Sequence, residues 1–358
     1  MKRIFMVGYS TDKGGVESYI ANLCSRLPKS KYEVIYDWPT IVIDGKEWIR
    51  PRNRHNYIKY REFWKRFFRE NHFDVLYYNT CDIVSIDLLK FAKKAGVPVR
   101  ILHSHNAGNQ LSINKKLSIF HQLTEKINKK NLDKYATKLF ACSKSAGDWM
   151  FENHLYEIIH NGIDLLKYQY DERKRNEIRS QYNIKSEKLI GCIGRLDPQK
   201  NPLYAEKIAE SVLEKDSSAK FVFIGDGELM SEIKGIVEEK GLEERILFAG
   251  AVDNVCEWMS AIDCLVMPSL FEGLPFVLVE AQAAGLPCIV SSNVSAESNL
   301  TGLVQFLDLE IGEKVWVDKI LSECKKERID VSQKLIVAGY SIENTVKEIS
   351  DIIESMRI

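Results

Sequence analysis

The feature that most constrains this chain is its alternation of short apolar runs with longer stretches of helical periodicity. Each run has the length of a buried β-strand. Strands that alternate with helices in this way form parallel sheets covered on both faces, and such sheets bind ligands beyond the carboxyl ends of their strands. The candidate strands cover 3–9, 32–38, 74–79, 98–105, 138–143, 189–195, 220–227, 246–250, 264–269 and 287–292.

The strand–helix series occurs twice, and 358 residues exceed what one compact core usually holds. We therefore expect an α/β fold with two Rossmann-like domains, 1–165 and 166–340. The amphipathic C-terminal helix, 341–358, is expected to pack back onto the first domain. No apolar run approaches the roughly 18 residues of a membrane span, and the basic start at 1–10 predicts a first strand, not a signal peptide. A cytoplasmic protein is expected.

The net charge is zero but unevenly distributed. Residues 1–170 hold 28 Lys and Arg against 17 Asp and Glu, a balance of +11, and the rest of the chain has the opposite balance of −11. In the first half, the stretch 57–72 is predicted to form a helix with aromatic residues on one face and basic residues on the other. This helix can pack on the sheet through its aromatics, lie on an anionic membrane surface, or do both. No motif supports nucleic-acid binding.

Glycine-bearing loops follow several predicted strands. Gly14 and Gly15 open a helix, where backbone amides favour an anion, although a purely structural turn explains them equally. Arg195 and Lys200 follow the strand at 189–194, where two cations suit a diphosphate or are simply solvated. The glycines of the turn at 225–227 fit a tight turn into a helix, which either brings the backbone near a ligand or is purely structural.

The stretch 269–285, SLFEGLPFVLVEAQAAG, places two glutamates eight positions apart. Glu272 falls in a loop after a strand, and Glu280 falls in the apolar helix that follows. A carboxylate in such a helix is seldom unpaired, so Glu280 requires either a ligand, such as ribose hydroxyls, or an internal partner. The amides of Gly273 and Leu274 lie near the start of the helix and can meet a phosphate or a sugar.

The pattern E-G-L-P-F-x-L-x-E-A at 272–281 resembles the E-x7-E signature of the retaining family 4 glycosyltransferases, which have the GT-B fold of two Rossmann-like domains facing each other across a cleft. Further short motifs occur in the order of that family, so the resemblance covers about residues 1 to 300. It is greatest for bacterial capsule and exopolysaccharide enzymes. The supporting motifs are GGVE (14–17), SHN (104–106), ACS (141–143), NGID (161–164), GR…K (194–200), GDG (225–227) and FAG (248–250).

The resemblance implies a metal-independent transfer from a nucleotide sugar, expected to be UDP-linked, without a resident cofactor. Arg195 and Lys200 would hold the donor diphosphate, Glu280 the ribose, and Glu272 the transferred sugar. His105 would contact the sugar near its reacting carbon. The further donor-binding residues implied are Gly14, Gly15, Asn161, Gly194, Gly225, Asp226, Gly250, Gly273 and Leu274. His103 is a rival for the role of His105, and Glu297 is a candidate for a donor-loop role.

The absence of any D-x-D sequence agrees with a metal-free site. The acceptor is expected to be a lipid-linked or oligosaccharide glycan of a growing surface polysaccharide, which would place the protein at the inner face of the plasma membrane. Two other functions stay open at this point. One is a GT-B-like sugar-nucleotide epimerase, which converts its donor without an acceptor; the other is a two-domain protein that binds a ligand without chemistry.

Overall fold

The computed structural model describes all residues except 9–13, 52–55, 107–118 and 357–358. The chain divides into two compact units, 1–162 with 342–358 and 163–341. The sequence expectation placed these divisions at 165/166 and 340/341. No helix within the described ranges is long and apolar enough to cross a membrane.

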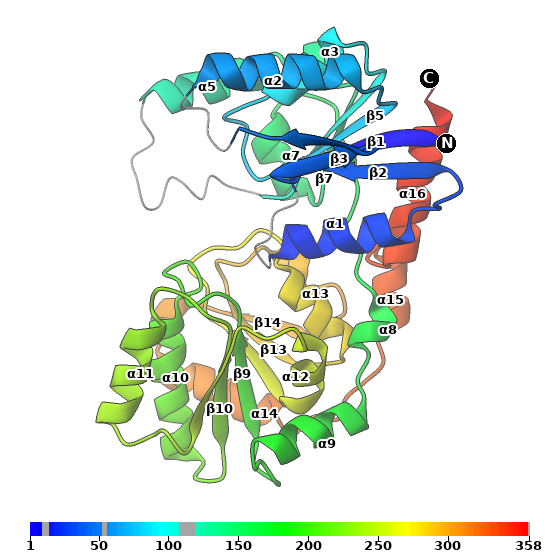
Figure 1. Cartoon of the computed structure of the whole chain (residues 1–358). Coiled ribbons are helices and arrows are strands. Elements are labelled where there is room, and N and C mark those ends of the chain that lie inside the picture. The colour runs from blue at the N-terminus through cyan, green and yellow to red at the C-terminus, as the bar shows by residue number, and fades with distance from the viewer. Residues whose placement is uncertain (9–13, 52–55, 107–118, 357–358) are drawn as a thin grey trace. The chain divides into compact units, whose positions relative to one another are not determined.

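The first unit is built on a six-stranded parallel sheet with the strand order β2-β1-β5-β6-β7-β8. The hairpin β3–β4 lies outside this sheet. The strands are β1 (Lys2–Val7), β2 (Tyr32–Tyr36), β3 (Thr40–Ile43), β4 (Lys46–Ile49), β5 (Val75–Thr80), β6 (Val99–Ser104), β7 (Lys138–Ala141) and β8 (Glu157–Ile158). The helices are α1 (Gly15–Arg26), α2 (Tyr57–Glu70), α3 (Asp87–Lys94), α5 (Ile119–Lys130), α6 (Leu132–Tyr135), α7 (Lys144–Phe151) and α16 (Ile342–Ser355). Figure 1 shows α2 and α3 on one side of the six-stranded sheet.

Helix α2 packs on this sheet through its aromatic side chains. Trp64, Phe67 and Phe68 are buried, and the ring centroids of Phe67 and Phe5 on β1 lie 5.1 Å apart. Aromatic pairs at such separations add about 0.5–1.5 kcal/mol beyond the area they bury. The basic residues of α2 are exposed on the opposite side. The packed-helix interpretation is therefore correct, and it leaves a basic surface available.

The C-terminal helix α16 belongs to the first unit, as expected. The Tyr32 hydroxyl lies 2.9 Å from the Ser350 hydroxyl, and the Lys2 ammonium donates to the Ile353 carbonyl at 3.1 Å. The apolar side chains of Ile349 and Ile353 are fully buried. The chain therefore crosses to the second unit and returns to complete the first.

The second unit has the strand order β11-β10-β9-β12-β13-β14, again all parallel. The strands are β9 (Leu189–Ile193), β10 (Lys220–Ile224), β11 (Ile246–Gly250), β12 (Cys264–Met267), β13 (Cys288–Ser291) and β14 (Val304–Leu307). The helices are α8 (Leu165–Tyr168), α9 (Glu172–Gln181), α10 (Pro202–Lys215), α11 (Met230–Glu239), α12 (Val255–Ala261), α13 (Phe276–Ala283), α14 (Glu313–Glu323) and α15 (Ser332–Val337), with short 3₁₀ turns η1 (Ala296–Ser298) and η2 (Leu309–Ile311).

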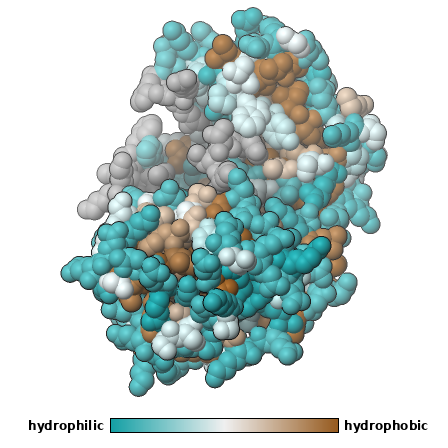
Figure 2. Space-filling model, turned by 60° about the horizontal axis from the view of Figure 1, so that its bottom comes forward, coloured by the Kyte–Doolittle hydropathy of each residue, from teal (hydrophilic) through white to brown (hydrophobic). Residues whose placement is uncertain are grey.

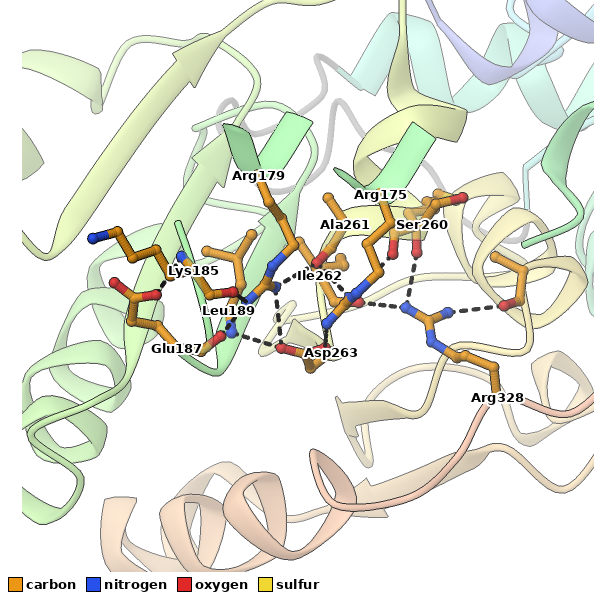
Figure 3. A network of polar contacts seen from close by, with 12 residues as sticks. Arg175, Arg179, Lys185, Glu187, Leu189, Ser260, Ala261, Ile262, Asp263 and Arg328 are labelled. Carbon is orange, nitrogen blue, oxygen red and sulfur yellow. Dashed lines mark hydrogen bonds and ion pairs between the residues drawn. The ribbon is translucent and has the colours of Figure 1, made fainter. Parts of the chain in front are cut away.

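Three arginines tie the helices of this unit to the start of β12 (Figure 3). Arg175 and Arg179 of α9 pair with Asp263, with nitrogen–oxygen distances of 2.7 and 3.5 Å. Arg328 donates to backbone carbonyls at the end of α12 and to the Ala284 carbonyl after α13. These guanidinium groups satisfy carbonyl groups that a helix end leaves without partners. The network thus fixes β12 and α13, which flank the loop that contains Glu272.

Candidate active site

Three glycines at adjacent strand ends form the base of the candidate site in the second unit. The Gly194 amide donates to the Ile224 carbonyl at 2.9 Å, and the Gly225 amide donates to the Gly250 carbonyl at 2.8 Å. A Cβ on Gly225 would lie 1.9 Å from the Gly194 carbonyl oxygen, and its φ is +138°. Only glycine permits this approach. A structural reason for Gly225 is therefore evident, whether or not its backbone also meets a ligand.

Asp197 organises the loop that follows β9. Its carboxylate accepts a hydrogen bond from the Lys200 amide at 3.1 Å and pairs with the Arg195 guanidinium at 3.2 Å. The Arg195 side chain is 65% exposed, whereas that of Lys200 is only 17% exposed. The two predicted cations therefore have different settings: Arg195 lies at the surface and Lys200 points into the loop structure.

Lys200 forms an ion pair with Glu272 that joins the loops after β9 and β12. Their nitrogen and oxygen atoms are 2.6 Å apart, and the Glu272 side chain is 11% exposed. The Leu270 amide donates to the Gln199 carbonyl at 2.8 Å, and the Asn201 side chain donates to the Pro268 carbonyl at 3.1 Å. An ammonium has three protons to donate. Lys200 can therefore stay paired with Glu272 and still donate to an anionic oxygen.

Backbone amides follow Glu272 at the approach to α13. Among the residues that the structure describes, no acceptor pairs with the amides of Gly273 or Leu274. The backbone of Glu272 is also held in place, because its carbonyl oxygen accepts a hydrogen bond from the Ser295 amide at 3.1 Å. Glu297 lies two residues further on, in η1. The helix itself begins at Phe276, slightly later than the amides that the sequence placed at its start.

Glu280 lies in the middle of α13 and has an internal partner. The Tyr168 hydroxyl at the end of α8 interacts with its carboxylate and favours the ionised form. Burial raises the pKa of Glu280, while Tyr168 and the charge of Lys167 lower it, and the net shift is upward. Keeping this carboxylate ionised in a buried position costs free energy of folding. Shifted pKa values of this kind are common among the acidic residues of functional sites.

The predicted site residue Asp226 is exposed and forms part of a turn after β10. Its carboxylate accepts from the next amide, that of Gly227, at 2.7 Å, and its carbonyl accepts from the Leu196 amide at 2.9 Å. These bonds join the loops after β9 and β10. Asp226 therefore has a structural role in addition to the donor-binding role expected for it.

In the first unit, a buried polar cluster lies where β5 and β6 end. His105 follows β6, and its Nε2 lies 2.9 Å from the Asn79 side-chain oxygen at the end of β5. His103 is fully buried, and its Nδ1 lies 3.0 Å from the Tyr77 hydroxyl. The two imidazole centroids are 4.1 Å apart, and Tyr19 of α1 packs against both rings.

The electrostatics of this cluster favour neutral histidines. Burial lowers the pKa of His105 to about 3, and an interaction with Asn161 opposes that shift. Burial also lowers the pKa of His103 well below its usual value. His105 is partly exposed while His103 is inaccessible. His105 is thus better placed than its rival to contact a ligand.

Three further predicted site residues, Asn161, Gly14 and Gly15, belong to the first unit. Asn161 follows β8 and is 2% exposed. Gly14 and Gly15 begin α1, the helix that contributes Tyr19, and Gly14 has no side-chain cap to offer its amides. Residues 10–13 of the same predicted loop lie outside the described residues.

Several participants in these clusters were missed at the sequence level, among them Asp197, Asn79 and Tyr168. Asp197 stands inside the loop that the sequence identified, and Asn79 is the polar residue at the end of an apolar strand, so a signal existed for both. Tyr168 has no such signal, because its contact with Glu280 spans 112 positions and arises only from the packing of α8 on α13.

The comparisons with known proteins agree with this geometry. Residues 13–166 match Glycosyltransferase Family 4, and residues 174–300 match Glycosyl transferases group 1. The chain is 30% identical over 371 residues to a putative glycosyltransferase, EpsF, of Bacillus subtilis (strain 168), covering 96% of this chain and 94% of that protein. The chain therefore belongs to the family 4 glycosyltransferases, and the expected family is confirmed.

A further relative and a solved structure are also similar to this chain. An Escherichia coli protein named UDP-Gal:alpha-D-GlcNAc-diphosphoundecaprenol alpha-1,3-galactosyltransferase is 34% identical over 208 residues, covering 54% of this chain and 53% of that protein. The crystal structure of HepE from Anabaena in complex with UDP-glucose superposes with a TM-score of 0.72 at 17% identity, covering 99% of this chain and all of that one. The fold is GT-B, as expected.

Proposed function

We propose that this glycosyltransferase moves a hexose or N-acetylhexosamine from a UDP-linked sugar to a lipid-linked glycan of a growing surface polysaccharide, with retention of configuration and without a metal. The observation that carries the proposal is the Lys200–Glu272 ion pair beside the open amides of Gly273 and Leu274. It provides a cation and backbone donors for a diphosphate, and a carboxylate for sugar hydroxyls, at the carboxyl ends of the strands.

In the proposed reaction, Lys200 and Arg195 stabilise the negative charge that grows on the diphosphate as it leaves. The bond between the sugar C1 and the phosphate oxygen breaks, and a bond from C1 to the acceptor oxygen forms on the same face. The acceptor hydroxyl proton passes to the departing phosphate oxygen, so no protein nucleophile is needed. Glu280 receives hydrogen bonds from the ribose. The names of two relatives support UDP-linked donors, and one of them supports a diphosphoundecaprenol-linked acceptor.

A peripheral membrane location is part of the same proposal. A lipid-linked acceptor stays at a bilayer, and the exposed basic residues of α2 would attract an anionic surface. Exposed apolar residues accompany them: Ile58 is 69% exposed and Ile49, in the β3–β4 hairpin, is 73% exposed. On the face shown in Figure 2, hydrophilic residues predominate and hydrophobic ones form separate areas.

The test combines a donor panel with one substitution. Nucleotide sugars are screened by thermal shift and by hydrolysis, and a UDP-sugar should give the largest response. Lys200→Ala should then lower kcat by on the order of 10²–10³ while changing donor affinity far less. Lys207→Ala, in an exposed position of α10, is the matched control and should keep full turnover.

Three results would contradict the proposal. Conversion of the donor without any acceptor would indicate an epimerase. Closure of the protein around a nucleotide sugar without any turnover would indicate a binding protein. A covalent glycosyl-enzyme trapped on a side chain would exclude same-face transfer.

A further inference from the structure

Asn79 is almost completely buried, with 2% of its surface exposed, and each end of its amide has a defined neighbour. The side-chain nitrogen donates to the Val7 carbonyl at 3.0 Å and approaches the Met6 sulfur at 3.2 Å. The side-chain oxygen lies 2.9 Å from His105 Nε2. Rotating the amide by 180° would place two acceptors, the Asn79 oxygen and the Val7 carbonyl, against each other, so the hydrogen-bond pattern fixes the orientation.

The fixed amide determines which nitrogen of His105 is protonated. An amide oxygen accepts only, so Nε2 of His105 must donate and therefore must bear the proton. The ring position is also fixed, because the His105 amide donates to the Thr80 carbonyl at 3.0 Å and the Tyr19 ring packs at 5.2 Å. In a neutral imidazole the other nitrogen then has a free lone pair.

We propose that Asn79 is a positioning residue that holds His105 as the Nε2–H tautomer, so that Nδ1 is presented as a hydrogen-bond acceptor. His105 Nδ1 is buried, and the Asn161 side chain lies close enough to His105 to influence its pKa, yet neither Nδ1 nor the two side-chain polar atoms of Asn161 have a well-formed hydrogen bond among the described residues. Buried polar atoms without partners are rare and mark places where a ligand or water completes the bonding. The complementary group is a hydroxyl, which can donate to Nδ1.

The consequence for catalysis rests on the proposed function. His105 would receive a hydrogen bond from a sugar or acceptor hydroxyl and would neither donate a proton nor stabilise an anionic oxygen. The groups packed around it do not supply a charge that would reverse this: Tyr19 faces it from α1, His103 from β6, and Asn161 from the segment after β8. Low pKa values of both histidines agree with this neutral state.

The tautomer can be measured directly in the unmodified protein. Long-range proton–nitrogen NMR correlations on ¹⁵N-histidine-labelled protein distinguish the two ring nitrogens, and loss of one signal set in His105→Gln assigns the residue. We expect a protonated Nε2 and an unprotonated Nδ1 throughout the range from about pH 5 to pH 8. A protonated Nδ1 or an imidazolium in that range overturns the inference, whatever the protein catalyses.

Two substitutions test the role of Asn79. Asn79→Asp keeps an acceptor but adds a charge, which should raise the His105 pKa and add an acid limb to the pH–activity profile. Asn79→Ala removes the acceptor and should lower kcat by up to about tenfold, the worth of one neutral hydrogen bond, with a smaller change in KM. Unchanged tautomer, titration and turnover in both variants would refute the positioning role.

The matched control is Asn128→Asp. Asn128 is equally buried in α5 of the same unit and donates to the Ile83 and Val84 carbonyls at 2.9 and 3.0 Å. The Asn128→Asp variant should lose about as much stability as Asn79→Asp, without altering the NMR signals of His105. If the tautomer is confirmed but His105→Gln transfers sugar at the wild-type rate, the inference about Asn79 holds while the proposed role of His105 fails.

Discussion

At the scale of single residues, the candidate site holds polar groups in settings that cost folding free energy. Glu280 is placed in an apolar helix with a raised pKa, and Lys200 and Glu272 are largely withdrawn from water. Withdrawing charges from water is unfavourable unless their partners compensate fully. Such residues are more easily explained by ligand binding than by stability, since an apolar substitute would pack as well.

Glu280→Gln should therefore weaken donor binding without weakening the fold. A glutamate whose pKa is raised on folding binds its proton more tightly in the folded state, so its contribution to stability falls as pH rises above the ordinary value of 4.5. The thermal midpoint of Glu280→Gln, relative to that of the wild type, should thus increase as the pH rises from about 4 to 7. Over the same range its donor KM should be raised, by roughly tenfold for one lost charged hydrogen bond.

Tyr168→Phe is the companion variant. It removes the hydroxyl that stabilises the ionised Glu280, so the pKa of Glu280 should rise further and the fall in stability should extend to higher pH. Calorimetry across the pH range and donor kinetics check both variants. Two results together would contradict the assignment of Glu280 to the donor site. The Glu280→Gln variant would have an unaltered donor KM, and its thermal midpoint relative to the wild type would not increase with pH.

At the scale of secondary-structure elements, the site depends on how closely adjacent strand ends approach one another. Gly225→Ala places a methyl group against the Gly194 backbone and imposes a left-handed φ on alanine. We expect a loss of more than about 3 kcal/mol in the unfolding free energy of the second unit, or failure to fold. Denaturant unfolding measures the change.

The control for that substitution is Gly235→Ala in helix α11. A Cβ there meets nothing within 4 Å, and alanine is about 1 kcal/mol better than glycine in a helix. Gly235→Ala should therefore be neutral or slightly stabilising. Equal stability of the two variants would show that the strand-end packing at Gly225 is not required.

The elements themselves were largely predictable, because apolar runs bounded by glycine and polar residues specify buried parallel strands. The hairpin β3–β4 was missed, although Asp44-Gly45, with φ of +49° and +77°, is a typical hairpin turn sequence. The pairing of Lys200 with Glu272 and the interaction of Glu280 with Tyr168 could not be predicted. Both join positions far apart in the sequence, and only tertiary packing decides which side chains meet.

At the scale of the whole molecule, the uneven charge predicts where the protein binds. The first half has a balance of +11, and the exposed basic residues of α2 belong to it. The β3–β4 hairpin joins this surface, since Trp48 packs on Phe67 at 5.3 Å between ring centroids. Each Lys or Arg near an anionic bilayer contributes about 1 kcal/mol to binding. The protein should thus sediment with anionic vesicles at low salt and dissociate at high salt.

A triple charge reversal separates a specific surface from overall charge. Lys59, Arg61 and Lys65 are exposed on α2, and their replacement by Glu should abolish sedimentation with anionic vesicles. The control replaces Arg173, Lys207 and Lys234, which are exposed in the second unit, and makes the same change in net charge. If α2 is the membrane-binding surface, the control protein keeps most of its vesicle binding, because screening limits each charge to about 10 Å at 0.1 M salt. Equal losses in both proteins would reduce the effect to net charge, and equal binding to neutral and anionic vesicles would contradict an electrostatic membrane surface altogether.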